Sequence, residues 1–104
     1  MEYTEFIASL ADEKPPDAGH VALRALWYDA NGRGDSAVRA ISNDSSYPSL
    51  RVRAYLARKS GIENDILKGY WKCGVDRWQG SFESEWEDIV RTILVQIVVE
   101  RSYL

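Results

Sequence analysis

The stretch AYLARKSGIENDILKGYW, residues 54–71, decides the fold because a helical pattern stops at Gly61 and restarts at once. The apolar positions that follow this glycine share one helix face and are Ile62, Ile66, Leu67, Tyr70 and Trp71. Glycine adopts the left-handed backbone conformation that closes a helix at little cost. We therefore expect Gly61 to be the turn of a hairpin made of two antiparallel helices.

An earlier stretch of the chain repeats this design. A shift of 29 residues, which places Gly32 on Gly61, aligns apolar positions on both sides of the two glycines. The aligned pairs are Ala25 with Ala54, Leu26 with Tyr55, Trp27 with Leu56, Ala37 with Ile66, Val38 with Leu67 and Ile41 with Tyr70. Two such units predict helical pairs that stack as in repeat proteins, and chance agreement of apolar positions is the alternative.

Turn and cap signals delimit the other helices. The periodicity predicts helices at about 3–11, 18–31, 36–42 and 50–59, then the helix after Gly61 and a C-terminal helix. Asp17, Asp35 and Ser81 are the expected N-caps of three of these helices. The stretch SNDSSYPS, residues 42–49, is expected to be a loop from its composition.

The C-terminal segment carries the longest apolar stripe. Its members are Phe82, Trp86, Ile89, Val90, Ile93, Leu94, Ile97 and Val98. Acidic residues gather at the start of this segment, where the helix dipole favours negative charge. Since the stripe is longer than a core of this size requires, we expect its far end to pack on a second subunit.

Composition restricts the class of protein. The chain has 104 residues, a typical size for one domain, and a net charge of −3 that gives no general attraction to nucleic acid or anionic lipid. Its single cysteine, Cys73, excludes an internal disulfide and fits a reducing compartment. The first residues lack the features of a signal peptide, and no apolar run is long enough to span a membrane. We expect a cytoplasmic protein.

No pattern in the chain indicates a catalytic centre, a cofactor or a metal. His20 is the only histidine, and the spacings HExxH, DxDxDG and CxxC are absent from the sequence. Cys73 has Lys72 and Arg77 nearby in sequence, but a packing role is the simpler interpretation for one cysteine. We therefore expect no catalytic residues, no cofactor and no metal ligands.

A basic and aromatic region occupies the helix at about 50–59. It contains Arg51, Arg53, Arg58 and Lys59, and Tyr55 lies among them. Such a patch could bind nucleic acid, which would show as a steep dependence of affinity on salt, but the net charge favours a solvated helix face. The candidate interaction residues are Arg53, Arg58 and Asn64 as polar contacts, with Tyr55, Trp71 and Trp78 as apolar anchors.

Two stretches, LWYDANGRGDSA (26–37) and VRAYLARKSGIENDILKGYWKCG (52–74), resemble a family of small, uncharacterised bacterial helical proteins. That family typically reads Ala-Tyr-Leu-His-Arg-x-Glu-Gly-Asp, then Tyr-Trp-Tyr, then a C-terminal helix rich in Glu and Trp. The shared positions include Leu26, Trp27, Gly32, Asp35, Ala54, Tyr55, Leu56, Arg58, Gly61, Asn64, Tyr70, Trp71, Glu85 and Trp86. The resemblance implies tetratricopeptide-like helical hairpins and no settled activity.

Departures from the family pattern are informative. Family histidines are replaced here by Val38, Arg53 and Ala57, and the acids around the hinge glycine by Ser60 and Ile62. If relatives assemble a His and Glu cluster for metal or acid–base chemistry, this chain lacks it. The resemblance thus implies a divergent member that keeps the scaffold and not an active centre.

Together these patterns predict a single all-α domain over residues 1–104, with five to six helices. Two helical hairpins stack in tetratricopeptide-like fashion, and an amphipathic C-terminal helix closes the fold. The expected function is a non-catalytic protein–protein interaction module that self-associates, as a homodimer, and whose hairpins form a groove for a peptide or a partner helix.

The alternative function is a small-molecule-binding protein or an enzyme with a pocket between the hairpins. It would require an enclosed pocket in which His20, Asp29, Asp35, Arg53 or Cys73 converge.

Overall fold

The computed structural model describes residues 1–17 and 19–102 of the chain, without the side chains of residues 101 and 102. The described residues form six helices and no strand, so the expected all-α fold is confirmed. The helices are α1 (Tyr3–Ser9), α2 (Val21–Ala30), α3 (Gly34–Ile41), α4 (Tyr47–Ser60), α5 (Glu63–Cys73) and α6 (Phe82–Ser102). The radius of gyration, 13.2 Å, is that of a compact domain of about 100 residues.

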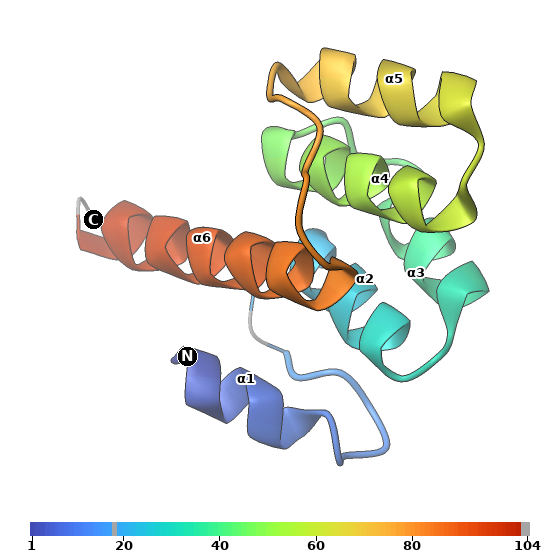
Figure 1. The fold of residues 1–104 in the computed structure, drawn as a ribbon. Coiled ribbons are helices and arrows are strands. Elements are labelled where there is room, and N and C mark those ends of the chain that lie inside the picture. The colour runs from blue at the N-terminus through green and yellow to red at the C-terminus, as the bar shows by residue number, and fades with distance from the viewer. Residues whose placement is uncertain (18, 103–104) are drawn as a thin grey trace.

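Both predicted glycine turns are present. Gly61 follows α4 with a left-handed backbone, φ 78°, and its N–H donates to the Ala57 carbonyl at 3.2 Å. Gly32 has φ 73° in the turn between α2 and α3. Because each turn reverses the chain, α2 packs on α3 and α4 packs on α5 as two helical hairpins (Figure 1).

The two hairpins agree in burial as well as in sequence. With Gly32 placed on Gly61, four buried residues of the first hairpin coincide with four of the second: Ala25 with Ala54, Leu26 with Tyr55, Ala37 with Ile66 and Ile41 with Tyr70. The aligned residues Val38 and Leu67 also match each other, because both are exposed, by 55% and 56%. The sixth aligned pair differs, since Trp27 is buried whereas Leu56 is half-buried. Five of the six pairs are therefore consistent with a repeated helical unit.

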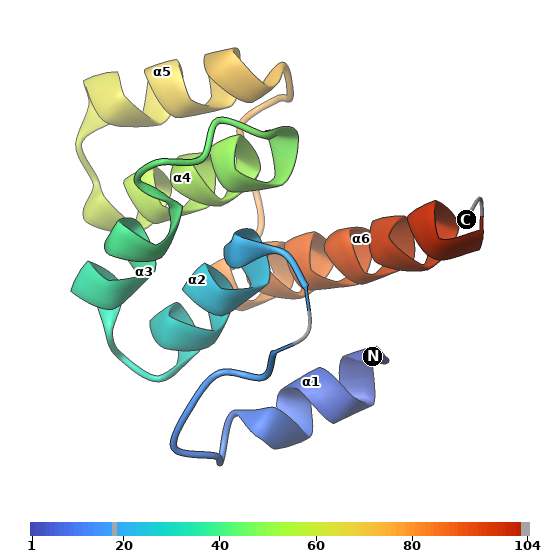
Figure 2. The same cartoon turned by 180° about the vertical axis from the view of Figure 1, so that it is seen from behind.

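Helix α6 covers the first helix of each hairpin. It packs on α2 and α4 (Figure 1 and Figure 2). Its residues Ile89, Val90 and Ile93 belong to the main core. Trp86 adds a specific contact, because its Nε1 donates to the Leu26 carbonyl at 2.9 Å. The face formed by α2 and α4 is therefore filled by the chain itself.

Helix α1 closes the core beneath α6 (Figure 2). Phe6 has no exposed surface, and its ring centroid lies 5.9 Å from that of Trp86. The indole of Trp27, 1% exposed, donates through Nε1 to the Ser9 carbonyl at 3.0 Å. The end of α1 is thereby fixed to α2 through a buried hydrogen bond.

Several predicted helix ends are wrong by a few residues. The first helix ends at Ser9, short of the expected 11, and α2 begins at Val21, after the expected 18. Asp17 does not cap α2: His20 does, because its Nδ1 accepts from the N–H of Ala22 at 3.0 Å. Histidine can replace a carboxylate here since its ring nitrogen is also an acceptor.

Two further corrections concern α3 and α4. Helix α3 starts at Gly34, so Asp35 lies in its first turn, and Arg33 occupies the cap position. Helix α4 starts at Tyr47, so the expected loop at 42–49 is helical at its end. Pro48 is compatible with this start, because the first turn of a helix leaves its N–H groups unpaired in any case. The predicted cap Ser81 is confirmed, as its Oγ accepts from Ser84 N–H at 3.0 Å.

Candidate interaction surfaces

Most of the basic region predicted on α4 is neutralised inside the molecule. Arg51 and Arg58 both pair with Glu85, and Lys59 pairs with Asp29 at 2.9 Å. Only Arg53 of these four cations forms no ion pair with the described residues, and it donates instead to the Ile41 carbonyl. An extended cationic surface for nucleic acid is therefore not formed by α4.

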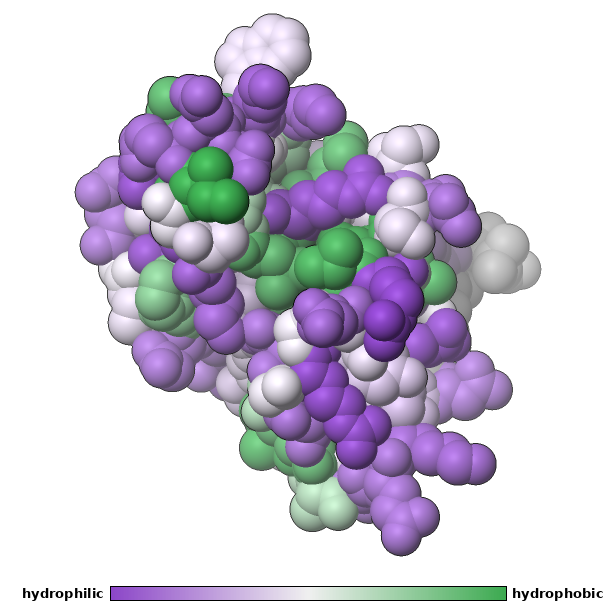
Figure 3. All heavy atoms as spheres, turned by 90° about the vertical axis from the view of Figure 1, so that its right-hand side faces the viewer, coloured by the Kyte–Doolittle hydropathy of each residue, from purple (hydrophilic) through white to green (hydrophobic). Residues whose placement is uncertain are grey.

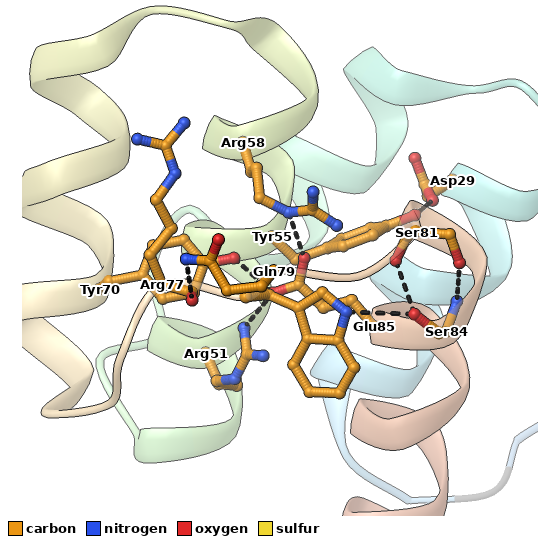
Figure 4. A network of polar contacts seen from close by, with 11 residues as sticks. Asp29, Arg51, Tyr55, Arg58, Tyr70, Arg77, Gln79, Ser81, Ser84 and Glu85 are labelled. Carbon is orange, nitrogen blue, oxygen red and sulfur yellow. Dashed lines mark hydrogen bonds and ion pairs between the residues drawn. The ribbon is translucent and has the colours of Figure 1, made fainter.

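Glu85 is the centre of a buried polar network (Figure 4). Its carboxylate has no exposed surface; Arg58 Nε donates to Oε1 at 2.8 Å, and Arg51 Nη1 lies 2.8 Å from Oε2. The hydroxyl of Tyr70 donates to Oε2 as well, and the Arg51 guanidinium lies over the Tyr70 ring, 5.4 Å from its centroid. The network ties α4, α5 and α6 together.

The surroundings of Glu85 change the acidity of Tyr70. Burial raises the pKa of the Tyr70 hydroxyl to about 12, helped by its hydrogen bond to the Glu85 carboxylate and by the charge of that group. Because a phenol with such a pKa stays protonated near neutrality, Tyr70 acts as a fixed donor to Glu85. It is poorly suited to be a general base.

A second network lies beside the first (Figure 4). The Tyr55 hydroxyl donates to Asp29 Oδ2 at 2.6 Å, and Lys59 Nζ lies over the Tyr55 ring, 5.6 Å from its centroid. Burial, and then the hydrogen bond to Asp29, raise the pKa of Tyr55 far above its ordinary value. The three side chains line a hollow of about 480 Å³ between α1, α2, α4 and α6.

The six predicted interaction residues do not form one site. Tyr55 and Arg58 lie within the two internal networks. Tyr55 is 2% exposed, and the side chain of Arg58 is 13% exposed. Arg53 is half-buried on α4, and Asn64 is exposed at the start of α5. Trp71 lies on α5, whereas Trp78 lines a separate hollow between α4 and α6.

Trp71 and Trp78 differ in exposure. Trp71 is 83% exposed on α5, a helix whose backbone packs closely only on α4 among the described helices. Of the apolar residues expected on one face of this helix, Ile66 and Tyr70 are buried, whereas Ile62 and Leu67 are exposed, because a single neighbour covers a narrow stripe. Trp78 is half-buried, and its Nε1 donates to Ser84 Oγ at 3.1 Å.

The residues that a catalytic pocket would require occupy different places: Asp29 lines the hollow beside Tyr55, Arg53 lines a different hollow on α4, and Asp35 is exposed on α3. His20 Nε2 is 3.0 Å from Ser46 Oγ and 3.7 Å from Asp44 Oδ2, at the junction of α2 and α4. Hydrogen bonds, from Ser46 above all and then from Ser49, lower the pKa of Asp44.

Cys73 is also separate from these groups. It is 8% exposed, and its Sγ lies 3.5 Å from the Tyr70 carbonyl. Across residues 1–17 and 19–102, no three His, Cys, Asp or Glu side chains are arranged to hold a metal ion.

The end of α6 is the largest exposed apolar region of this helix. Val95, Val98 and Val99, which we call the valine face, are 62%, 57% and 46% exposed. They border a mostly apolar hollow of about 300 Å³ whose other walls are formed by Met1, Glu2, Tyr3, Arg91 and Leu94. By contrast, the face seen in Figure 3 is mostly hydrophilic, and its apolar residues form separate patches.

Sequence reasoning assigned Glu85 only to the acidic start of a helix and so missed its burial. A signal was available: Glu85 lies three residues after Phe82 and four before Ile89, on the apolar stripe itself. Arg51, Tyr55 and Arg58 are spaced at i, i+4 and i+7, on one face of α4. An acid on an apolar stripe together with two arginines on a neighbouring helix face would have indicated a buried ion pair.

Comparison of the chain with protein-family models, curated proteins and solved structures gives no match. The resemblance to small bacterial helical proteins therefore stays a prediction. None of the helices in residues 1–17 and 19–102 combines the length and the apolar character that crossing a membrane requires.

Proposed function

We propose that this protein is a non-catalytic interaction module that binds a second copy of itself through the valine face of α6. The observation that carries the proposal is the exposure of Val95 and Val99, 62% and 46%, on a helix whose earlier turns form the core. Contiguous apolar surface of this kind is typical of protein interfaces.

Helix lengths explain why this face is exposed. At 1.5 Å per residue, the 21 residues of α6 extend about 31 Å, whereas the 14 residues of α4 and the 10 of α2 extend about 21 Å and 15 Å. The last turns of α6 therefore extend past the helices that cover its first turns (Figure 1).

A second copy is the occupant that these features favour. The three valines carry no charge, and the two charged residues of the adjoining hollow, Glu2 and Arg91, are of opposite sign, so a two-fold axis can place this face against itself without net repulsion. Two-fold dimers are the commonest assemblies of soluble proteins, and their interfaces are richer in apolar surface than the rest of the protein. The family resemblance, which implies a scaffold without an active centre, agrees with a binding function.

Light scattering coupled to size-exclusion chromatography tests the proposal. We expect the wild-type protein to elute with twice the mass of 11.8 kDa and the Val95→Glu variant to elute as a monomer with unchanged helix content. Val38→Glu is the matched control, because Val38 is a similarly exposed valine, 55%, on the distant helix α3. A wild-type monomer, or a Val95→Glu variant that dimerises like the wild type, contradicts the proposal.

A further inference from the structure

A groove runs between α3, α4 and α5, on a surface separate from the valine face. It consists of two adjoining hollows of about 540 Å³ and 220 Å³ that share Arg53, Ala57 and Asp65. We call it the α3–α5 groove. The second helices of the two hairpins, α3 and α5, both pack on α4 and lie on opposite sides of it (Figure 1), so the groove follows the stretch of α4 between them.

The two ends of the α3–α5 groove differ in chemistry. The larger hollow has mostly apolar walls, to which Val38, Ile41 and Leu56 contribute, and Val38 is 55% exposed. Its polar lining residues are Ser42, Arg53, Ser60 and Asp65. The smaller hollow is lined by the cations Lys68 and Lys72. The groove is therefore apolar at one end and basic at the other.

The charge of the basic end is not neutralised by the protein. Arg53, Lys68 and Lys72 form no ion pair with the described residues, whereas Asp65 is the one acid that lines the groove. This contrasts with Arg51, Arg58 and Lys59 on the same hairpin, all of which are paired internally. The region keeps an excess of positive charge in a chain whose net charge is −3.

Arg53 is held in place for binding. Its Nη2 donates to the Ile41 carbonyl at the end of α3, which fixes the guanidinium between the two hollows. A guanidinium has five N–H donors, so others remain to bind a carboxylate. A cation fixed before binding loses less side-chain entropy on binding than a free one.

We propose that the α3–α5 groove binds a peptide segment of another protein in which apolar side chains stand next to acidic ones. The apolar residues enter the hollow lined by Val38, Ile41 and Leu56, and the carboxylates contact Arg53, Lys68 and Lys72. Charge complementarity of this kind fixes the orientation of the bound peptide and the selectivity for acidic sequences. Nucleic acid fits the groove less well, because the walls of the larger hollow are mostly apolar and the net charge of −3 repels a polyanion.

Fluorescence anisotropy with a labelled peptide, Leu-Leu-Ala-Glu-Glu-Glu, tests the proposal on the full chain. We expect saturable binding that weakens with added salt, and a loss of affinity of about tenfold or more in the double variant Lys68→Glu, Lys72→Glu. The matched control is Lys14→Glu, Arg24→Glu, which changes the net charge equally at exposed residues elsewhere. Val38→Asp should also weaken binding, because it places a carboxylate in the apolar end.

Each other outcome overturns the proposal. The proposal is wrong if the peptide does not bind at concentrations up to about 1 mM. It is also wrong if the two double variants lose affinity equally, or if Leu-Leu-Ala-Lys-Lys-Lys binds as tightly as the acidic peptide. Tighter binding of a single-stranded oligonucleotide than of the acidic peptide would assign the groove to nucleic acid instead. Repeating the titration on Val95→Glu separates this groove from self-association, since the two surfaces share no residue.

Discussion

Arg58 Nε donates a 2.8 Å hydrogen bond to Oε1 of Glu85, a carboxylate with no exposed surface. The bond joins the last turn of α4 to the first turn of α6. Burying a carboxylate is costly unless cations and hydrogen bonds replace the lost water. Here Arg51, Arg58 and Tyr70 surround Glu85, so three helices depend on one acid for the charge balance of this region.

Removal of Glu85 should therefore destabilise the protein strongly. We expect Glu85→Ala to lower the free energy of unfolding by about 3–5 kcal/mol, because Arg51 and Arg58 would remain partly buried without their partner. Urea denaturation followed by circular dichroism measures the change. Glu83→Ala, at an exposed acid in the same turn of α6, is the control and should stay within about 0.5 kcal/mol of wild type. Equal stability of the two variants would contradict a structural role for Glu85.

The raised pKa of Tyr70 should make the stability of the protein depend on pH in the alkaline range. Its pKa is raised to about 12 in the folded protein from an ordinary value of 10.0, so the folded state holds this proton more tightly than the unfolded chain does. The contribution to stability is complete below pH 10 and is lost as the pH rises from 10 towards 12. We expect the unfolding free energy to fall over this window.

Substitution of Tyr70 isolates its share of this pH dependence. Tyr70→Phe should make the alkaline decline less steep, and part of the decline should remain because the pKa of Tyr55 is also raised. Tyr47→Phe, at a tyrosine that is 45% exposed, serves as the control. A decline identical in Tyr70→Phe and wild type would show that Tyr70 does not couple to folding.

The helical hairpins could be predicted from the sequence because their turns rest on local chemistry. Gly32 and Gly61 need a left-handed backbone, which glycine adopts without a steric penalty, and the apolar periodicity restarts directly after each turn. Helix starts were less predictable. The cap of α2 is His20 rather than Asp17, because ring nitrogen and carboxylate can both accept the same N–H.

The candidate interaction residues could be predicted only in part, because the sequence does not show which charged side chains pair in the folded protein. A helix with four cations indicates a basic surface as long as the acidic residues that pair with them are unknown. Those partners, Asp29 and Glu85, lie about 30 residues away in the chain. The exposure of Trp71 likewise depends on α5 packing its backbone closely against only one described helix, α4, which no local pattern reveals.

Two tryptophans should respond differently to truncation. Trp71 is 83% exposed, so Trp71→Ala should change the unfolding free energy by no more than about 0.5 kcal/mol. Trp86 is 8% exposed and donates to the Leu26 carbonyl, so Trp86→Ala should cost about 3–5 kcal/mol. Urea denaturation of both variants measures the difference. A Trp71→Ala protein as unstable as Trp86→Ala would mean that another surface covers Trp71.

Two glycines inside helices should respond to alanine in opposite directions. Gly34 lies in the first turn of α3 with no atom within 4 Å of an added Cβ, so Gly34→Ala should stabilise the protein by up to about 1 kcal/mol. Gly69 lies inside α5, where an added Cβ would be 3.0 Å from Ala54 Cα on α4.

Because the backbone of α4 cannot rotate away as a flexible side chain could, Gly69→Ala should force α4 and α5 apart. We expect a loss of about 1–3 kcal/mol in spite of the better helix propensity of alanine. Thermal denaturation of both variants shows whether each substitution raises or lowers the stability. If Gly69→Ala were as stable as Gly34→Ala, the two helices of the second hairpin would pack less closely than the Gly69–Ala54 contact indicates, and the adjoining basic end of the α3–α5 groove would have a different shape.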